Sequence, residues 1–91
     1  MITLENCFQK SDKVPWRIIE GEAILVGVEQ GEVIHLNDTA AEIWNAIDEK
    51  NTVKDIVNHI LDEFEVEKEE AEKDVLELLD KLLEKGVIEP K

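Results

Sequence analysis

The spacing of the hydrophobic residues changes at Asn37, and this change most constrains the fold. Residues 16–36 read WRIIEGEAILVGVEQGEVIHL, a run rich in Val and Ile that glycine interrupts at short intervals. This pattern is typical of strands joined by tight turns, and it predicts strands over residues 16–20, 22–28 and 32–36. The connections between these strands are too short for crossover helices, so we expect antiparallel pairing.

The segments that flank these strands carry weaker signals. Glu29-Gln30-Gly31 predicts a hairpin turn between the second and third strands, with Gly31 at a position that needs positive φ. Pro15 precedes the first strand, where its missing N–H does no harm. Residues 1–14 have no clear pattern, so the sequence leaves open whether they are mobile or add an edge to the sheet.

Beyond Asn37 the hydrophobic residues recur at helical spacing. Helices are predicted over about 38–49, 53–64 and 67–85, and Gly86 is expected to end the third. The apolar faces of the first two helices consist of Ala40, Ile43, Trp44 and Ile47, and of Val53, Ile56, Val57, Ile60, Leu61 and Phe64.

The starts of the first two helices carry capping signals. The side chain of Asn37 can cap the first helix, and Thr39 with Glu42 offers an alternative capping box. Thr52 with Asp55 resembles a capping box for the second helix. The stretch HLNDTAAEIW is therefore interpreted as an elbow that fixes the last strand relative to the helices.

The third helix has an unusually wide apolar face. At 100° per residue its apolar side chains span about 160°, whereas about 100° is enough to seat a helix on a core. We assign Leu78 and Leu82 to the core edge, and Leu76, Leu79 and Leu83 to an edge that faces a groove, with Leu79 between the two. Burial on two sides or helix pairing in a dimer remains an equal alternative.

The sequence shows no constellation typical of an enzyme. Cys7 is the single cysteine, which excludes an internal disulfide, and His35 and His59 lie on different elements. His59 has helical i, i±4 spacing to Asp55 and Glu63, but such a set is far more typical of a solvated face than of a metal site. We therefore predict no catalytic residue, no cofactor and no metal.

Length and charge narrow the function classes further. The 91 residues have room for a single core, so residues 1–91 are predicted to form one domain. The net charge is −13, of which residues 37–91 carry −10, and this charge disfavours binding to nucleic acid or to anionic membranes. It suits a partner with basic segments, or simply solubility. With no signal peptide and no transmembrane run visible, we expect a cytoplasmic protein.

Several motifs, in this order, resemble those of a known family. They are GEAILV, LNDTAAEIW, the Thr52-Val53 pair that opens the second helix, and DVLELLDKLLEKGVI near the end. Each motif is loose alone, but their order and spacing from about Trp16 to Glu89 are fairly specific. On these motifs the chain resembles the PqqD-like family, whose peptide-binding module is also called the RiPP recognition element.

The resemblance implies an α+β, winged-helix-like fold with a three-stranded antiparallel sheet followed by three helices. It also implies a non-catalytic function. Members bind the leader segment of a ribosomally made precursor peptide and present it to a modifying enzyme, often a radical SAM maturase; in the namesake pathway the product is pyrroloquinoline quinone. By resemblance, the leader pairs with the third strand and lies against the third helix, at Glu32, Val33, Ile34, His35, Leu36, Val75, Leu76, Leu79 and Leu83. The nearby acids Asp74, Glu77 and Asp80 are expected to favour a leader with Lys or Arg beside its apolar anchors.

The chain departs from the family at the start of the third helix. Family members often have Asp, Ser or Pro there, whereas this chain has VEKEE, so we expect a weaker cap around Glu67. Two alternatives to leader binding stay open. One is a winged-helix nucleic-acid binder, which the acidic third helix disfavours. The other is a structural dimerisation domain, so the sequence allows a monomer or a dimer.

Overall fold

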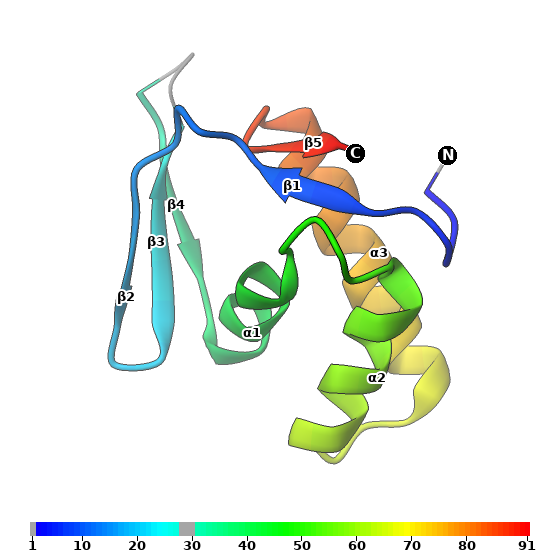
Figure 1. The fold of residues 1–91 in the computed structure, drawn as a ribbon. Helices are drawn as coiled ribbons and strands as arrows, with labels where there is room; N and C mark the ends of the chain where they lie inside the picture. Colours follow the sequence, from blue (N-terminus) through cyan, green and yellow to red (C-terminus); the bar gives the residue numbers. More distant parts are fainter. Residues whose placement is uncertain (1, 28–30) are drawn as a thin grey trace.

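The fold consists of a three-stranded antiparallel sheet followed by three helices, as predicted. The computed structural model describes residues 2–27 and 31–91. The strands β2 (Trp16–Ile19), β3 (Glu22–Val26) and β4 (Val33–Leu36) lie in the order β2-β3-β4. The helices α1 (Asp38–Ala46), α2 (Val53–Glu63) and α3 (Lys68–Glu84) follow them (Figure 1). This arrangement confirms the α+β, winged-helix-like class.

The hairpin between β3 and β4 is partly outside the described residues. Residue 28, predicted to end the second strand, and Glu29 and Gln30 of the predicted turn all fall there. Gly31 has a φ of +63°, the positive value that the turn prediction requires.

A second, two-stranded sheet joins the two ends of the described chain. Its strands are β1 (Phe8–Lys10) and β5 (Ile88–Pro90), paired antiparallel with Phe8 opposite Pro90. Phe8 is 4% exposed, so β1 is part of the core rather than a mobile tail. The sequence left both possibilities open for residues 1–14. It also placed Pro90 merely beyond the last helix, whereas Pro90 ends a strand.

The helix starts match their predicted caps. Asn37 Oδ1 accepts the Ala40 N–H at 2.9 Å and caps α1. Thr52 and Asp55 form a complete capping box at the start of α2. Glu67, the N-cap residue of α3, makes no side-chain hydrogen bond to the helix, which confirms the expected weakness there.

The first helix ends three residues earlier than predicted. It stops at Ala46, and the following turn is held by Asp48, whose Oδ1 accepts the N–H groups of Lys50 and Asn51 at 3.0 and 2.9 Å. An Asp side chain that satisfies nearby N–H groups offers the backbone an alternative to helical hydrogen bonds. This local competition ends the helix.

The hydrophobic core lies between the inner face of the β2-β3-β4 sheet and the three helices. The sheet contributes Ala23, Leu25, Ile34 and Leu36, and α1 contributes Trp44, which is fully buried. On α3 the buried residues are Ala71, Val75, Leu79 and Leu82. These four side chains lie at the centre of the wide apolar face of α3, not at one of its edges.

This packing corrects the assignment of the α3 leucines. Leu79 is 0% exposed and belongs to the core, so placing it on the groove edge was wrong. Leu78, placed in the core from sequence, is half-buried and lines a cavity. Leu76 and Leu83 are half-buried at the opposite edge. The face is wide because its centre is buried and both edges pack partly against neighbouring segments.

Candidate functional site

The outer edge of β4 presents backbone groups that the sheet does not use. The Gly27 N–H donates to the Glu32 carbonyl at 2.7 Å, which makes that pair a hydrogen-bonded one in the ladder. Hydrogen-bonded and non-hydrogen-bonded pairs alternate in an antiparallel ladder. Leu25 and Ile34 lie two positions further along the ladder, so they too are a hydrogen-bonded pair, and the N–H and C=O groups of Ile34 face β3. The N–H and C=O groups of Val33 and His35 consequently face outward from the free edge.

The predicted strand residues thus divide into two groups. Ile34 and Leu36 are 4% and 2% exposed, and their side chains belong to the core. Val33, which is 58% exposed, and His35 direct their side chains to the opposite face of the sheet. A ligand at this edge can reach the backbone of Val33 and His35, whereas Ile34 and Leu36 offer it no exposed side chain.

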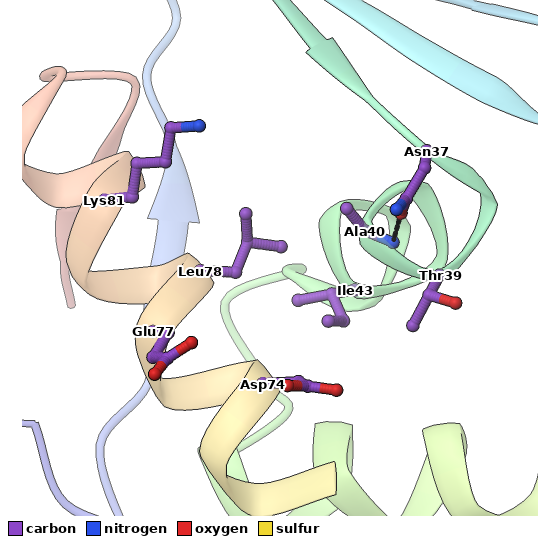
Figure 2. Close-up of a pocket in the computed structure, with 8 residues that line it drawn as sticks. All are labelled: Asn37, Thr39, Ala40, Ile43, Asp74, Glu77, Leu78 and Lys81. Carbon is purple, nitrogen blue, oxygen red and sulfur yellow. Dashed lines mark hydrogen bonds between the residues drawn. The ribbon is translucent and has the colours of Figure 1, made fainter. Parts of the chain in front are cut away.

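A cavity of about 420 Å³ lies beside this edge, between the end of β4, the first turns of α1 and the middle of α3 (Figure 2). In the close-up, Leu78 extends from α3 toward Ile43 and Ala40 of α1, so the cavity has an apolar centre. Charged and polar groups surround it. The lining residues are Asn37, Thr39, Ala40, Ile43, Asp74, Glu77, Leu78 and Lys81.

The structure changes which side of α3 faces this site. Of the predicted helix residues, Val75 and Leu79 are fully buried, and Leu76 is half-buried away from the cavity lining. Leu83 lines a different cavity of about 270 Å³, formed with Ile2, Asn6, Cys7, Phe8, Pro90 and Lys91. A helical projection gives the width of an apolar face. It cannot say which edge a neighbouring strand will meet. Of the acids expected near the groove, Asp74 and Glu77 line the cavity and Asp80 does not, and sequence reasoning missed Lys81.

An ion pair lies at the opposite end of β4 from this cavity. The outer edge of β4 between the cavity and the ion pair, together with the facing side of α3, is called the groove below. The Lys85 Nζ lies 3.0 Å from both carboxylate oxygens of Glu32, and both side chains are partly buried. Glu32 directly precedes β4 and Lys85 directly follows α3. The pair therefore ties the residue before the edge strand to the C-cap residue of α3.

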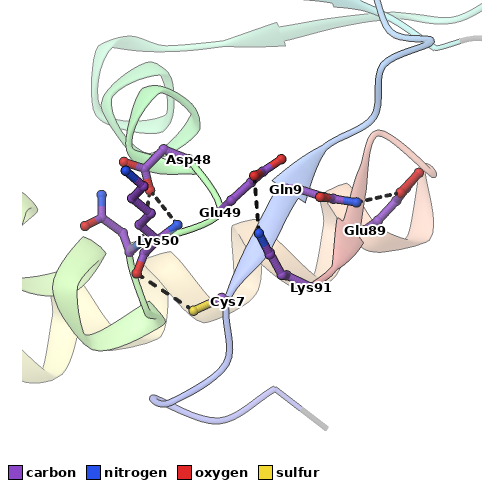
Figure 3. Close-up of polar contacts among 8 residues, drawn as sticks. Cys7, Gln9, Asp48, Glu49, Lys50, Glu89 and Lys91 are labelled. Atoms are coloured by element: carbon purple, nitrogen blue, oxygen red, sulfur yellow. Dashed lines mark hydrogen bonds and ion pairs between the residues drawn. The ribbon is translucent and has the colours of Figure 1, made fainter.

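The histidine and cysteine residues do not gather into a chemical site. His59 Nε2 lies 2.9 Å from Glu42 Oε2, a contact between α2 and α1 rather than with Asp55 or Glu63. Within residues 2–27 and 31–91, no group of three or more His, Cys, Asp or Glu side chains is placed to hold a metal ion. Cys7 Sγ has a weak contact of 3.9 Å with the Lys50 carbonyl (Figure 3).

Among the residues that the structure describes, two titratable groups, Asp48 and Lys10, have shifted pKa values, and both lie away from the cavity. The N–H groups of Asn51 and Lys50 lower the pKa of Asp48 (Figure 3). Burial lowers the pKa of Lys10. The Lys10 ammonium donates to the Ile47 carbonyl at 2.7 Å and lies 5.3 and 5.2 Å from two tryptophan ring centroids, those of Trp16 and Trp44.

A family model described as "Coenzyme PQQ synthesis protein D (PqqD)" matches residues 22–88, which is most of the chain. The chain belongs to the PqqD family. The matched segment contains β3, β4 and all three helices, and therefore the whole groove. It begins after β1 and β2.

Two solved structures resemble this PqqD-family chain closely. The first, described as "TbiB1 in Complex with the TbiA(beta) Leader Peptide", is 27% identical with a TM-score of 0.80 and covers 89% of this chain and 94% of its own. The second, "Lasso peptide synthetase B1 complexed with the leader peptide", is 29% identical with a TM-score of 0.79 and covers 91% and 98%. A search of curated proteins gave no match.

A helix that crosses a membrane needs about 20 consecutive, predominantly apolar residues. In the described part of the chain, no helix combines the length and the apolar composition needed to cross a bilayer.

Proposed function

We propose that this chain is a non-catalytic module that binds the leader segment of a ribosomally synthesised precursor peptide. The leader adds as an antiparallel strand to the outer edge of β4 and lies in the groove against α3. Two supports come from the comparisons: the PqqD family match, and two similar structures that are described as complexes with leader peptides.

The observation that carries this proposal is the free backbone edge of β4 beside a cavity. Unpaired N–H and C=O groups of an edge strand form a template for another strand, and peptide recognition by strand addition uses such edges. Val33 and His35 supply these groups, while Leu78 and Ile43 supply apolar surface for alternate side chains of the added strand. Backbone pairing gives affinity, and the cavity gives selectivity.

The module presents the bound precursor to a modifying enzyme, and the proposed class of this enzyme is a radical SAM maturase. The proposed location of this step is the cytoplasm. Presentation to an enzyme fits a site that offers a peptide a free backbone edge, an apolar surface and exposed charges. The alternative of nucleic-acid binding is disfavoured, because Asp74 and Glu77 line the groove of a chain whose net charge is −13.

A matched pair of proline variants tests the site. His35→Pro removes an outward N–H of β4 and leaves the hydrogen bonds to β3 in place. Ile18→Pro makes the same change on the outer edge of β2, since the Val26 N–H bond to the Pro15 carbonyl fixes Ile18 as outward-facing there. Both side chains are exposed.

The assay is a calorimetric titration with the leader of a precursor encoded beside this gene. Loss of binding in folded His35→Pro, with binding retained in Ile18→Pro, is the expected result. Equal affinity of folded His35→Pro and the wild-type chain would show that the peptide does not pair with β4. No binding by the wild-type chain to any precursor encoded nearby would overturn the function itself.

A further inference from the structure

The groove is bordered by β4 and α3, whose chains run in opposite directions. A peptide bound in it therefore has a defined direction relative to α3. Glu32, just before β4, contacts Lys85, just after α3. Asn37, just beyond β4, lines the cavity with Asp74 in the first half of α3 (Figure 2). The strand and the helix accordingly run in opposite senses in Figure 1. A peptide strand that pairs antiparallel with β4 therefore runs the same way as α3. Its N-terminal part passes Asp74, and its C-terminal part passes Lys81 and approaches Lys85.

Charges are sorted by sign along this path. Asp74 and Glu77 come first, Leu78 follows, and Lys81 comes next. The three charged side chains are exposed, and within residues 2–27 and 31–91 they form no ion pair with one another or with other side chains. Each is thus available to a charge on a ligand, although Glu77 and Lys81 have the spacing of a helical i, i+4 pair.

The spacing of these groups matches the repeat of a strand. Alternate side chains of an added strand face the same way, so those beside Leu36 and Ile34 point toward α3. Four strand residues span about 13 Å, and the seven helical steps from Asp74 to Lys81 span about 10 Å. The long Lys81 side chain can span this difference. Three inward-facing residues at positions i, i+2 and i+4 therefore meet the carboxylates, the apolar centre and the ammonium in turn.

We propose that this groove selects leader segments by charge order, reading Lys or Arg, then an apolar residue two positions on, then Asp or Glu two further on, from N- to C-terminus. The inference rests on the proposed leader binding at β4 and adds the chemistry of the ligand to it. The reverse order places carboxylate against carboxylate and ammonium against ammonium, and such juxtapositions exclude wrong partners. The groove is thereby selective for direction as well as composition.

The test is selection from a library of random twelve-residue peptides by mRNA display on the immobilised chain. Three arms are run: the wild-type chain, the folded His35→Pro variant, and a triple variant with Asp74→Lys, Glu77→Lys and Lys81→Glu. The three altered residues are exposed, so the triple variant is expected to fold. Enriched wild-type sequences should carry the proposed order, the triple variant should enrich the reverse order, and His35→Pro should enrich neither.

Affinity measurements then give the size of the effect. An enriched peptide and its charge-reversed partner of the same composition should differ about tenfold in Kd at low salt, since each exposed charge position contributes a few-fold. The difference should narrow as salt is added.

The outcomes separate this inference from the proposed function. Peptides that enrich on the wild-type chain without charge order, or that enrich in the same order on the triple variant, would overturn the charge selection while leaving strand addition intact. Equal enrichment on His35→Pro would overturn the placement at β4, and with it the charge order derived from that placement. Failure of every arm to enrich any peptide would overturn both peptide binding and its selectivity.

Discussion

Replacing Leu79 with alanine should destabilise the domain far more than the same change at its neighbour Leu78. Leu79 is 0% exposed at the centre of the α3 face, so its truncation leaves a cavity and costs about 2–5 kcal/mol. A domain of this size has a total stability of about 5–14 kcal/mol, and each kcal/mol corresponds to about 4–8 °C in Tm. The melting temperature should therefore fall by about 8–40 °C. Leu78 is half-buried, and its truncation should cost about 1 kcal/mol.

The assay is urea unfolding followed by tryptophan fluorescence. Trp44 is fully buried and reports the loss of the core, whereas Trp16 is 42% exposed. Titration of both variants with the precursor leader completes the comparison. Leu78→Ala should weaken leader binding while the domain stays stable, because Leu78 forms the apolar centre of the cavity. If the two variants lose equal stability, or if Leu78→Ala binds as well as the wild-type chain, the division of α3 into a buried centre and a groove edge is refuted.

Three further predictions concern caps and titration. Asn37→Ala removes the side chain that caps α1 and should lower the free energy of unfolding by about 0.5–2 kcal/mol in urea unfolding; an unchanged value would mean that another residue caps the helix. Glu67→Ser should raise the Tm, because α3 lacks a side-chain cap and serine supplies one, typically about 1 kcal/mol; no rise would place the helix start elsewhere. Asp48→Asn keeps an acceptor for the Lys50 and Asn51 N–H groups but does not titrate. The folded pKa of Asp48 lies below its ordinary value of 3.8, so its stabilisation is complete above that value and is lost as pH falls through the folded pKa. Urea unfolding from pH 7 to about pH 2 should therefore show the wild-type advantage over Asp48→Asn shrinking at the acid end, and a constant difference would contradict this assignment.

Local signals in the sequence determine most of the fold. The Val- and Ile-rich run, the helical periods and the Asn37 and Thr52 caps each act over a few residues. The elements and caps predicted from them are present in the structure, although the first helix ends three residues early. The pairing of β1 with β5 was not predictable in this way. It joins residues about 80 positions apart, and three-residue strands are too short to show a hydrophobic period.

The candidate site was predictable in part for a similar reason. The elbow at Asn37 and the position of the edge strand follow from the order of the elements. The Gly27–Glu32 pair sets the hydrogen-bond pattern of the ladder, and this pattern decides which backbone groups of β4 face outward. The packing of α1 decides which edge of α3 borders the groove. Both features depend on tertiary structure. A single chain sequence carries the width of the α3 face but not its orientation.

The β1–β5 pairing has a consequence for how the protein is made. Phe8 leaves the ribosome about 80 residues before its strand partner, Pro90, is synthesised. The β2–β3 hairpin and the helices have only near neighbours to find, so they can form while synthesis continues. Until Ile88–Pro90 emerge, β1 has no strand partner. Phe8, which is buried in the folded protein, therefore stays exposed to solvent or to chaperones during that time. Closing this long loop is expected to be the last step of folding on the ribosome.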